Sequence, residues 1–437
     1  MLDDRVEKWM KEIRVIDGGV ETELQKRAKL KIEGHNIESC CLLKNDPNLV
    51  CDVHKSFLQA GCDIISTNTF SASPETLTAA LNITDTEAVE LMRHSVRLVQ
   101  RAMATDDWLT RKIQKLPILI AGSLGPYNAC IVKENVSKNK VQENSESTFE
   151  NLVEFHYRRA EILISSGVDF LAWNKISSLN EILAISEVMR RLPPTALGWI
   201  TIDSSDGQIT TNGDSLSQMA LEVEKCEKVF GVGICCNISN NMIGQALANL
   251  YSIYDPCESG NEEGFHPPPC TIRKHHSEES IINGAKRKIL ILLANDGQIW
   301  IPPSSKRLKR GQLLPTLTTL GPKRWVNTIL QWSQKRSISS LGVTNSNNKE
   351  VCTSGSSTIL PLAQWVGGCC RVGPEYIRQL AESMKPDEYI TILPTNDPLY
   401  PYTKEADDKK TTVFKNVTKR KQSEHLSDKM SKKRSKK

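Results

Sequence analysis

The chain has 437 residues, of which 39% are hydrophobic, 13 are cysteines and 8 are tryptophans. This length suits one large α/β domain with insertions, or two smaller domains. No apolar stretch approaches the ~20 residues that a membrane helix needs, and the first residues lack the cationic start and apolar core of a secretory signal. The cysteine content therefore suggests a reducing compartment, and we expect a cytoplasmic protein with free or metal-bound thiols.

The net charge of +5 is unevenly distributed along the chain. Residues 409–437 contain 12 basic and 2 acidic side chains, which leaves 44 basic and 49 acidic residues in the remainder. The body is therefore mildly acidic and lacks a general nucleic-acid-binding pattern. We expect residues 386–437 to form a C-terminal extension that ends in a disordered basic tail.

The basic tail has several interpretations. Its clusters at 419–421 and 432–437 resemble a bipartite nuclear-import signal. A nuclear-import receptor is then a candidate partner, and nuclear localisation is an alternative to the cytoplasm. Unspecific charge attraction to RNA and a solvated tail without function are the other interpretations.

Apolar runs alternate with amphipathic segments along the body of the chain. Residues 48–59 and 215–228, for example, carry apolar residues at helical spacing. Eight candidate strands with helical patterns between them predict a parallel sheet, and the number eight favours a closed (β/α)8 TIM barrel over residues 1–385. The predicted strands are 15–20, 63–70, 117–124, 169–173, 197–203, 231–236, 288–293 and 362–370.

Two polar stretches interrupt this alternation. Residues 254–285 contain three consecutive prolines and the pair His275 and His276, and residues 337–357 are rich in serine, asparagine and threonine. Unstructured loops of this length are uncommon in compact domains, so we expect either genuine insertions or errors in the gene model. The two histidines could form a metal cluster with Cys270, but a solvated loop is the favoured interpretation.

Two cysteine pairs follow predicted strands. Cys235 and Cys236 end strand six, and Cys369 and Cys370 follow two glycines at the end of strand eight. In a TIM barrel the carboxyl ends of the strands meet at one face, where the catalytic residues lie. Three thiolates around one zinc ion would leave a fourth position open for water or substrate, as in catalytic sites. Buried structural cysteines are the alternative, because free cysteine is among the most buried residue types.

Five short motifs occur along the chain. They are VIDGG at 15–19, STNTF at 66–70, GSLGPY at 122–127, GICC at 233–236 and GGCCR at 367–371. In this order and at these distances they resemble the homocysteine S-methyltransferase family, across roughly residues 10–385. The resemblance implies a zinc-bearing (β/α)8 barrel that transfers a methyl group to homocysteine and produces methionine.

The resemblance also implies the zinc ligands. By this comparison Cys236, Cys369 and Cys370 bind the metal, whereas Cys235 stands where the family usually has asparagine and is not a ligand. Successive side chains of a strand point to opposite faces, so Cys369 and Cys370 can both face the metal only if the chain leaves the strand there. The preceding glycines permit that turn.

Substrate-binding residues follow from the same resemblance. Asp17 looks like the family's acidic residue near the homocysteine amino group, and Gly18 and Gly19 would let the backbone approach the ligand. Thr67 and Asn68 are candidates for polar contacts to the amino acid. A turn or helix-capping role for Asp17, and ordinary strand-end hydrogen bonding for Thr67 and Asn68, are the alternatives.

The segment after strand four departs from the family pattern. Asn174 stands at the glutamate of a Phe-Glu-Thr-Ile-Pro type of motif that helps to hold the substrate's ammonium group, and Lys175 adds a positive charge beside it. Asn174 can accept a hydrogen bond but brings no charge, and hydrogen bonds to charged groups are worth ~1.5–3 kcal/mol. Glu21, where the family commonly has glycine, is a second carboxylate that could compensate. We therefore expect Asn174 to bind substrate with weakened affinity.

Two functions are compatible with these residues. The first is zinc-dependent methyl transfer to homocysteine from S-methylmethionine or S-adenosylmethionine, with betaine as a third donor, because no cobalamin or folate module accompanies the barrel. The second is a non-catalytic homologue that keeps zinc and acts as a binding or regulatory protein. Intact cysteines favour the enzyme, whereas Asn174, Lys175 and the insertion before strand eight favour the non-catalytic homologue.

Overall fold

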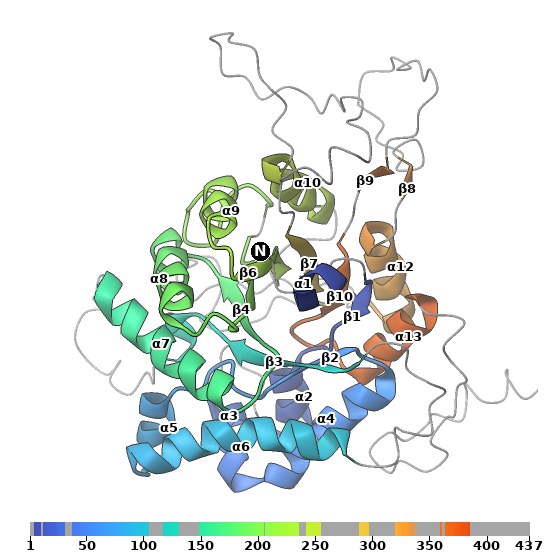
Figure 1. Cartoon of the computed structure of the whole chain (residues 1–437). Helices are drawn as coiled ribbons and strands as arrows, with labels where there is room; N and C mark the ends of the chain where they lie inside the picture. Colours follow the sequence, from blue (N-terminus) through green and yellow to red (C-terminus); the bar gives the residue numbers. More distant parts are fainter. Residues whose placement is uncertain are drawn as a thin grey trace, which may run out of the picture. The chain divides into compact units, whose positions relative to one another are not determined.

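Eight parallel strands form the nearly closed barrel of the computed structural model, and helices surround them (Figure 1). The structure describes residues 4–9, 12–30, 37–104, 117–130, 148–204, 206–235, 242–254, 288–296, 320–333, 336–337, 359–360 and 363–384. The barrel strands are β1 (Arg14–Val15), β2 (Ile64–Ser66), β3 (Leu119–Leu124), β4 (Phe170–Ile176), β5 (Gly198–Ile202), β6 (Val229–Cys235), β7 (Ile289–Ala294) and β10 (Trp365–Gly368). This arrangement confirms the predicted (β/α)8 TIM barrel.

The sheet closes between its first two strands. Its order is β1-β10-β7-β6-β5-β4-β3-β2, and a parallel bridge between Ile16 and Ile64 joins the two ends. Asp63 strengthens this junction, because its carboxylate accepts a hydrogen bond from the Val15 backbone at 2.8 Å and its own N–H donates to the Val15 carbonyl at 2.7 Å. The carboxyl ends of β1 and β2 are thereby held side by side.

The helices have recognisable start and stop signals in the sequence. Asp46 caps α4 by accepting from the Leu49 N–H at 3.0 Å, and Gly61 ends that helix with a φ of 99°. Thr84 and Glu87 form a capping box at the start of α6. The helices are α1 (Asp4–Trp9), α2 (Val20–Arg27), α3 (Glu38–Asn45), α4 (Pro47–Ala60), α5 (Pro74–Leu81), α6 (Asp85–Met103), the 3₁₀ turn η2 (Tyr127–Ala129), α7 (Phe149–Ser165), α8 (Leu179–Arg191), α9 (Leu216–Glu224), α10 (Ile243–Tyr254), α12 (Pro322–Ser333) and α13 (Pro374–Met384). The predicted helical segments 48–59 and 215–228 correspond to α4 and α9.

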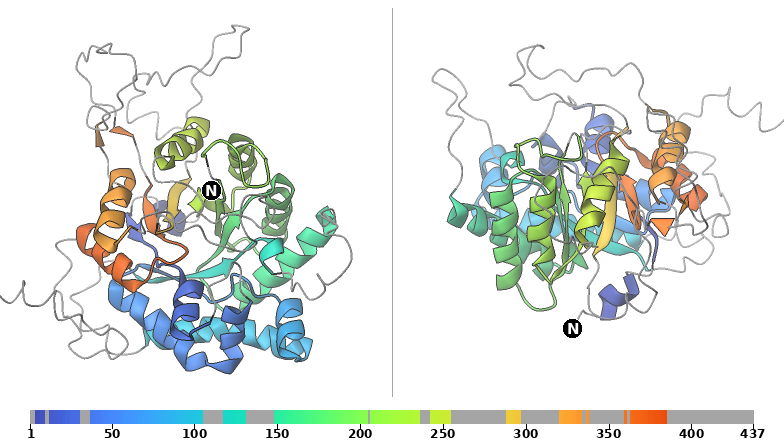
Figure 2. Two further views of the ribbon diagram at one scale, coloured as in Figure 1. Left: turned by 180° about the vertical axis from the view of Figure 1, so that it is seen from behind. Right: turned by 90° about the horizontal axis from the view of Figure 1, so that it is seen from above.

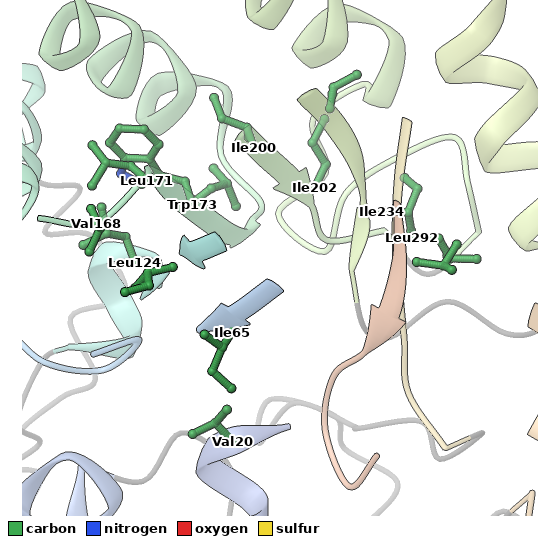
Figure 3. Packing of buried hydrophobic residues seen from close by; sticks show 14 of the residues in the cluster. Val20, Ile65, Leu124, Val168, Leu171, Trp173, Ile200, Ile202, Ile234 and Leu292 are labelled. Atoms are coloured by element: carbon green, nitrogen blue, oxygen red, sulfur yellow. The ribbon is translucent and has the colours of Figure 1, made fainter. Parts of the chain in front are cut away.

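The main hydrophobic core lies between the barrel and its helices. Outward-facing strand residues such as Trp173, Ile200, Ile234 and Leu292 are fully buried in this layer (Figure 3). A second cluster fills the barrel interior, and it includes Trp9 of α1. Figure 2 shows α1 at one end of the barrel, apart from the surrounding helices.

Some boundaries differ from the sequence-based prediction. The predicted strand 15–20 was too long, because Gly18 and Gly19 form a turn and Val20 already begins α2. The predicted strand 63–70 ends at Ser66. A short antiparallel pair, β8 (Arg336–Ser337) with β9 (Ile359–Leu360), was not predicted.

Several predicted regions lie outside the described residues. Apart from Tyr254 and Ser337, the two expected insertions fall there, as do His275, His276, Cys270 and the whole of 386–437. The proposed boundary at residue 385 therefore stays a prediction. Among the described helices, none has the length and apolar composition needed to cross a membrane.

Candidate active site at the carboxyl end of the barrel

Aromatic rings fill the amino-terminal half of the barrel interior. Phe170, Trp199, Phe230 and Trp365 come from four different strands, and all are at most 2% exposed. The ring of Trp9 contacts three of them, with centroid distances of 5.4–6.1 Å. This packing closes the amino-terminal end, so a ligand-binding site is confined to the opposite end of the strands, as is usual in TIM barrels.

Polar side chains replace the aromatic ones toward the carboxyl ends of the same strands. Side chains alternate along a strand, so Asn174 and Thr201 share the inward face of Phe170 and Trp199. Ser66 occupies the corresponding inward position of β2. The inside of the barrel therefore changes from apolar to polar in the direction of the predicted site.

Asp17 connects the ends of β1 and β2. Its Oδ2 accepts from the Ser66 backbone N–H at 2.7 Å, and its Oδ1 accepts from the Ser66 hydroxyl at 2.9 Å. The side chain is only 2% exposed. Burial raises the pKa of Asp17 to about 7, although both hydrogen bonds from Ser66 oppose that rise. Asp17 is thus a buried carboxyl group at the expected end of the barrel.

Gly18 and Gly19 are packed against another part of the chain. A Cβ atom on Gly18 would overlap the Val372 carbonyl oxygen, and one on Gly19 would lie 2.6 Å from the Cys369 carbonyl oxygen. The space that these glycines leave is therefore filled by the loop after β10. Close approach of the protein's own backbone explains both glycines without a ligand.

The loop after β10 carries the predicted metal ligands Cys369 and Cys370. The Cys369 N–H donates to the Ala294 carbonyl at 2.9 Å, and Val372 N–H donates back to Cys369 at 3.0 Å, which closes a tight turn. Arg371 has a φ of 65° in this turn, and its N–H donates to the Thr22 hydroxyl at 2.9 Å. The chain leaves the strand here, as predicted. Cys369 is 9% exposed, and Cys370 is exposed.

The end of β6 lies level with this loop in the sheet. Cys235 pairs with Leu293, and Leu293 pairs with Gly367. Only β7 separates β6 from β10, so the two strands are about 10 Å apart, at ~4.8 Å per strand. Cys236 itself lies outside the described residues. Within the described part of the chain, no group of three or more histidine, cysteine or acidic side chains is placed to hold a metal ion.

Thr67 and Thr69 are engaged in hydrogen bonds within the barrel. Their hydroxyl oxygens are 2.7 Å apart, Thr69 donates to the Ser123 carbonyl at 2.8 Å, and the Ser123 N–H donates to Thr67 at 3.0 Å. Both threonines therefore stabilise the junction of β2 and β3. This is the strand-end role that the sequence left open.

Asn68 has an unused acceptor. Its Nδ2 donates to the Ser39 carbonyl at 2.9 Å. Its Oδ1 is buried and has no hydrogen-bond donor among the described residues. Because a carbonyl can only accept, the contact with Ser39 fixes which end of the amide is the nitrogen.

The family of the chain follows from comparison with known proteins. Residues 14–384 match the model of a single family, described as homocysteine S-methyltransferase. The chain belongs to the homocysteine S-methyltransferase family. A selenocysteine Se-methyltransferase of Brassica oleracea var. italica is 33% identical over 229 residues, which span 51% of this chain and 64% of that protein. Homocysteine S-methyltransferase 1 of Zea mays is 26% identical over 376 residues, which span 85% and 94% of the two chains.

Solved structures of a homocysteine methyltransferase share the fold. The metallated form of the Escherichia coli homocysteine methyltransferase MmuM has a TM-score of 0.56 at 20% identity, and the match covers 85% of this chain and 96% of MmuM. At 20% identity, this structural similarity establishes that the two proteins share the barrel fold over the matched region. The residues of the site must then be judged from this chain's own geometry.

Two hydrogen bonds fix the orientation of the Asn174 amide in this member of the homocysteine S-methyltransferase family. Its Oδ1 accepts from Trp199 Nε1 at 2.9 Å and from the Thr201 hydroxyl at 3.0 Å. Because the indole N–H can only donate, the atom facing Trp199 must be the oxygen. The amide NH₂, a donor, is then the group that Asn174 can offer a ligand. Lys175 follows in a left-handed conformation with a φ of 67°, where the register between β4 and β5 shifts.

Glu21 lies at the same end of the barrel. Its Oε1 accepts from the hydroxyl groups of Ser71 at 2.7 Å and Ser39 at 3.3 Å. Enclosure by neighbouring groups raises the pKa of Glu21 to about 7, the Ser71 hydroxyl opposes the rise, and the charge of Cys370 adds to it. The sequence offered Glu21 as a second carboxylate that could compensate for Asn174. Its neighbour Thr22 contacts the cysteine loop, because its hydroxyl group accepts from the Arg371 N–H at 2.9 Å.

Arg159 supports the loops of the site and was missed in the sequence. Its guanidinium group is fully buried and donates to the carbonyls of Ala72 at 2.8 Å, Gly125 at 2.9 Å and Phe70 at 2.8 Å. It thereby connects the loops that follow β2 and β3. The sequence contained one indication of this role, because an arginine stands on the apolar face of the segment that forms α7.

Glu181 of α8 fixes the segment that follows β3. Its Oε1 accepts from the Tyr127 backbone N–H at 2.6 Å and lies 2.8 Å from Nε2 of His156. Burial lowers the pKa of His156, so this contact is made by a neutral ring that donates to the carboxylate. The segment after β3 is fixed by this pair as well as by Arg159.

Proposed function

We propose that the protein transfers a methyl group from S-methylmethionine or S-adenosylmethionine to the thiol of homocysteine, in a zinc-dependent reaction that gives methionine. The observation that carries this proposal is the cysteine loop Cys369–Cys370, level with Cys235 at the end of β6 and at the polar end of the barrel. Membership of the homocysteine S-methyltransferase family supports the same reaction class.

The donor set fits zinc. Cys236, Cys369 and Cys370 would hold the ion, since thiolates are soft ligands that suit Zn²⁺. Cys369 and Cys370 lie on a tight turn next to Asp17, whose backbone carbonyl accepts from Gly368 at 2.9 Å. Bound zinc would lower the pKa of the substrate thiol, so that the nucleophilic thiolate predominates at neutral pH.

The residues of the chain would contribute mainly positioning. The rigid turn from Cys369 to Val372 and the hydrogen bonds of Asp17, Thr67 and Arg159 fix the loops around the substrate before it binds. Holding the thiolate in line with the donor methyl group supplies much of the rate acceleration in such a reaction. A sulfonium donor leaves as a neutral thioether, so no side chain needs to act as a general acid.

A second candidate function is a non-catalytic homologue that binds zinc and acts as a binding or regulatory protein. The orientation of Asn174 favours this alternative, because its free amide nitrogen cannot accept a hydrogen bond from a substrate ammonium group. Under this alternative the cysteines would still bind zinc, whereas homocysteine would not be methylated.

One assay distinguishes the two functions. Purified, zinc-loaded protein is incubated with homocysteine and S-methylmethionine, and methionine formation is measured. Zinc-dependent turnover is the result expected for the enzyme. No turnover with S-methylmethionine, S-adenosylmethionine or betaine, in protein that retains zinc, would establish the non-catalytic homologue instead.

A further inference from the structure

Under the proposed function, on which this inference rests, the ammonium group of the substrate needs a binding site. An ammonium group in a partly buried site needs an acceptor and a compensating negative charge. Asn174 supplies neither, because Trp199 and Thr201 occupy its oxygen. Asp17 is only 2% exposed, and Ser66 donates to both of its oxygens, so it is less accessible to a ligand than the half-buried Glu21.

Glu21 has the contacts of a carboxylate that still accepts donors. Two hydroxyl groups, from Ser39 and Ser71, both donate to Oε1. A carboxylate offers about four acceptor positions, so Oε2 retains capacity for an ammonium group. Glu21 is also only half-buried, and the hydroxyl group of the next residue, Thr22, accepts from the Arg371 N–H of the cysteine loop at 2.9 Å. Glu21 therefore combines a fixed orientation with partial exposure, on the part of α2 that contacts the cysteine loop.

A second acceptor belongs to the same hydrogen-bonded cluster. Ser39 donates from its hydroxyl to Glu21 and accepts at its carbonyl from Asn68 Nδ2. The opposite end of the Asn68 amide is the buried Oδ1 that has no donor in the described part of the chain. Leaving a buried acceptor unpaired costs about 1–3 kcal/mol, so a ligand that donates to this oxygen would recover that cost.

We propose that Glu21, together with Oδ1 of Asn68, binds the α-ammonium group of the amino-acid substrate. The negative charge that Asn174 of β4 lacks is thus supplied from the first turn of α2. The ammonium group then lies on the β1–β2 side of the barrel end, near the cysteine loop. Glu21 determines which thiols bind, because it distinguishes an amino acid from a thiol without an amino group.

The experiment compares two ligands that differ only in this group. Binding of L-homocysteine and of 4-mercaptobutanoate, which lacks the amino group, is measured by calorimetry on the zinc-loaded full-length protein. Wild type should bind L-homocysteine at least tenfold more tightly. Glu21→Gln keeps the size of the side chain but removes its charge, and it should weaken L-homocysteine binding about 10–100-fold. Binding of 4-mercaptobutanoate should change by less than about twofold.

The control is Glu222→Gln, which removes a partly exposed carboxylate on α9 that pairs with Lys225 at 2.7 Å. This variant should bind both ligands as wild type does. Equal weakening of both ligands in Glu21→Gln, or no weakening of L-homocysteine, would overturn the assignment. Equal affinity of the wild-type protein for the two ligands would also overturn the assignment. This measurement does not depend on the folding of any variant. Failure of wild type to bind either ligand would instead reject the proposed function.

Discussion

Asn174 accepts hydrogen bonds from Trp199 and Thr201, and these contacts determine what its side chain offers to a ligand. Both partners lie on β5, more than twenty residues further along the chain, at 2.9 and 3.0 Å. The asparagine is therefore a structural link between two strands at the polar end of the barrel. Its uncharged side chain is compatible with substrate binding if the compensating charge comes from Glu21.

The structural role of Asn174 predicts a stability effect. Asn174→Leu leaves the buried Trp199 indole and the Thr201 hydroxyl without their acceptor, and it should lower the free energy of unfolding by about 1–3 kcal/mol. Asn174→Asp keeps an oxygen in the same place and serves as the matched variant. Urea unfolding of the three proteins checks this prediction. Unchanged stability of the leucine variant would mean that the two hydrogen bonds contribute little.

Candidate residues could be located from the sequence, but their partners could not. The motifs correctly placed Asp17, Asn68 and Asn174 near strand ends. The partners in the hydrogen bonds that decide their roles are Ser66, Ser39 and Trp199, which are 49, 29 and 25 residues away in the chain. Such pairings depend on the closed barrel, so no local pattern reveals them. The placement of Cys236 stays a prediction.

The helices and strands were more predictable from the sequence than the side-chain hydrogen bonds. All eight barrel strands overlap predicted apolar runs, although β1 does so only at Val15. The reason is that a parallel strand covered on both faces has a nearly continuous apolar sequence. The end of β1 was misjudged because Val20 continues the apolar pattern beyond Gly18 and Gly19, although it belongs to α2. The β8–β9 pair was missed because each strand has only two residues.

The contacts of Arg159 predict that α7 stabilises the loops after β2 and β3. Arg159→Met leaves the carbonyls of Ala72 and Gly125 without this donor in the interior, and it should destabilise the fold by about 3 kcal/mol or more. Arg159→Lys keeps the charge but not the planar fork of donors, so it should recover only part of this loss. Thermal unfolding measures the effect. A stable methionine variant would show that the loops after β2 and β3 are held without Arg159.

The burial of His54 predicts how the stability of the whole protein depends on pH. It lies on α4, is fully buried, and neither ring nitrogen has a partner among the described residues. Burial lowers the pKa of His54 from 6.5 to about 3. The unfolded chain therefore takes up this proton first, and stability falls as the pH drops below 6.5. The contribution of this one group between pH 7 and pH 5 is about 2 kcal/mol.

His54→Leu removes that titration from the core. The variant should lose about 2 kcal/mol less stability than wild type between pH 7 and pH 5, as measured by urea unfolding at both pH values. Parallel losses in the two proteins would show that His54 does not govern this pH range.

The basic tail is expected to act separately from the barrel. All excess positive charge lies in 409–437, and the family match ends at residue 384. Deletion from Lys409 onward should change the distribution of the protein between nucleus and cytoplasm but leave methyl transfer unchanged. Microscopy of a tagged chain and the methionine assay measure the two effects. Loss of turnover in the shortened protein would contradict a separate role for the tail.

The proposed reaction depends on a zinc site of Cys236, Cys369 and Cys370 that takes the homocysteine thiol as its fourth ligand. X-ray absorption at the zinc edge counts the sulfur ligands of the bound ion. We expect three sulfur ligands at about 2.3 Å in the zinc-loaded protein, four after addition of homocysteine, and loss of bound zinc in Cys370→Ala but not in Cys226→Ala. A sulfur count that homocysteine does not change, or full zinc content in Cys370→Ala, would contradict this zinc site.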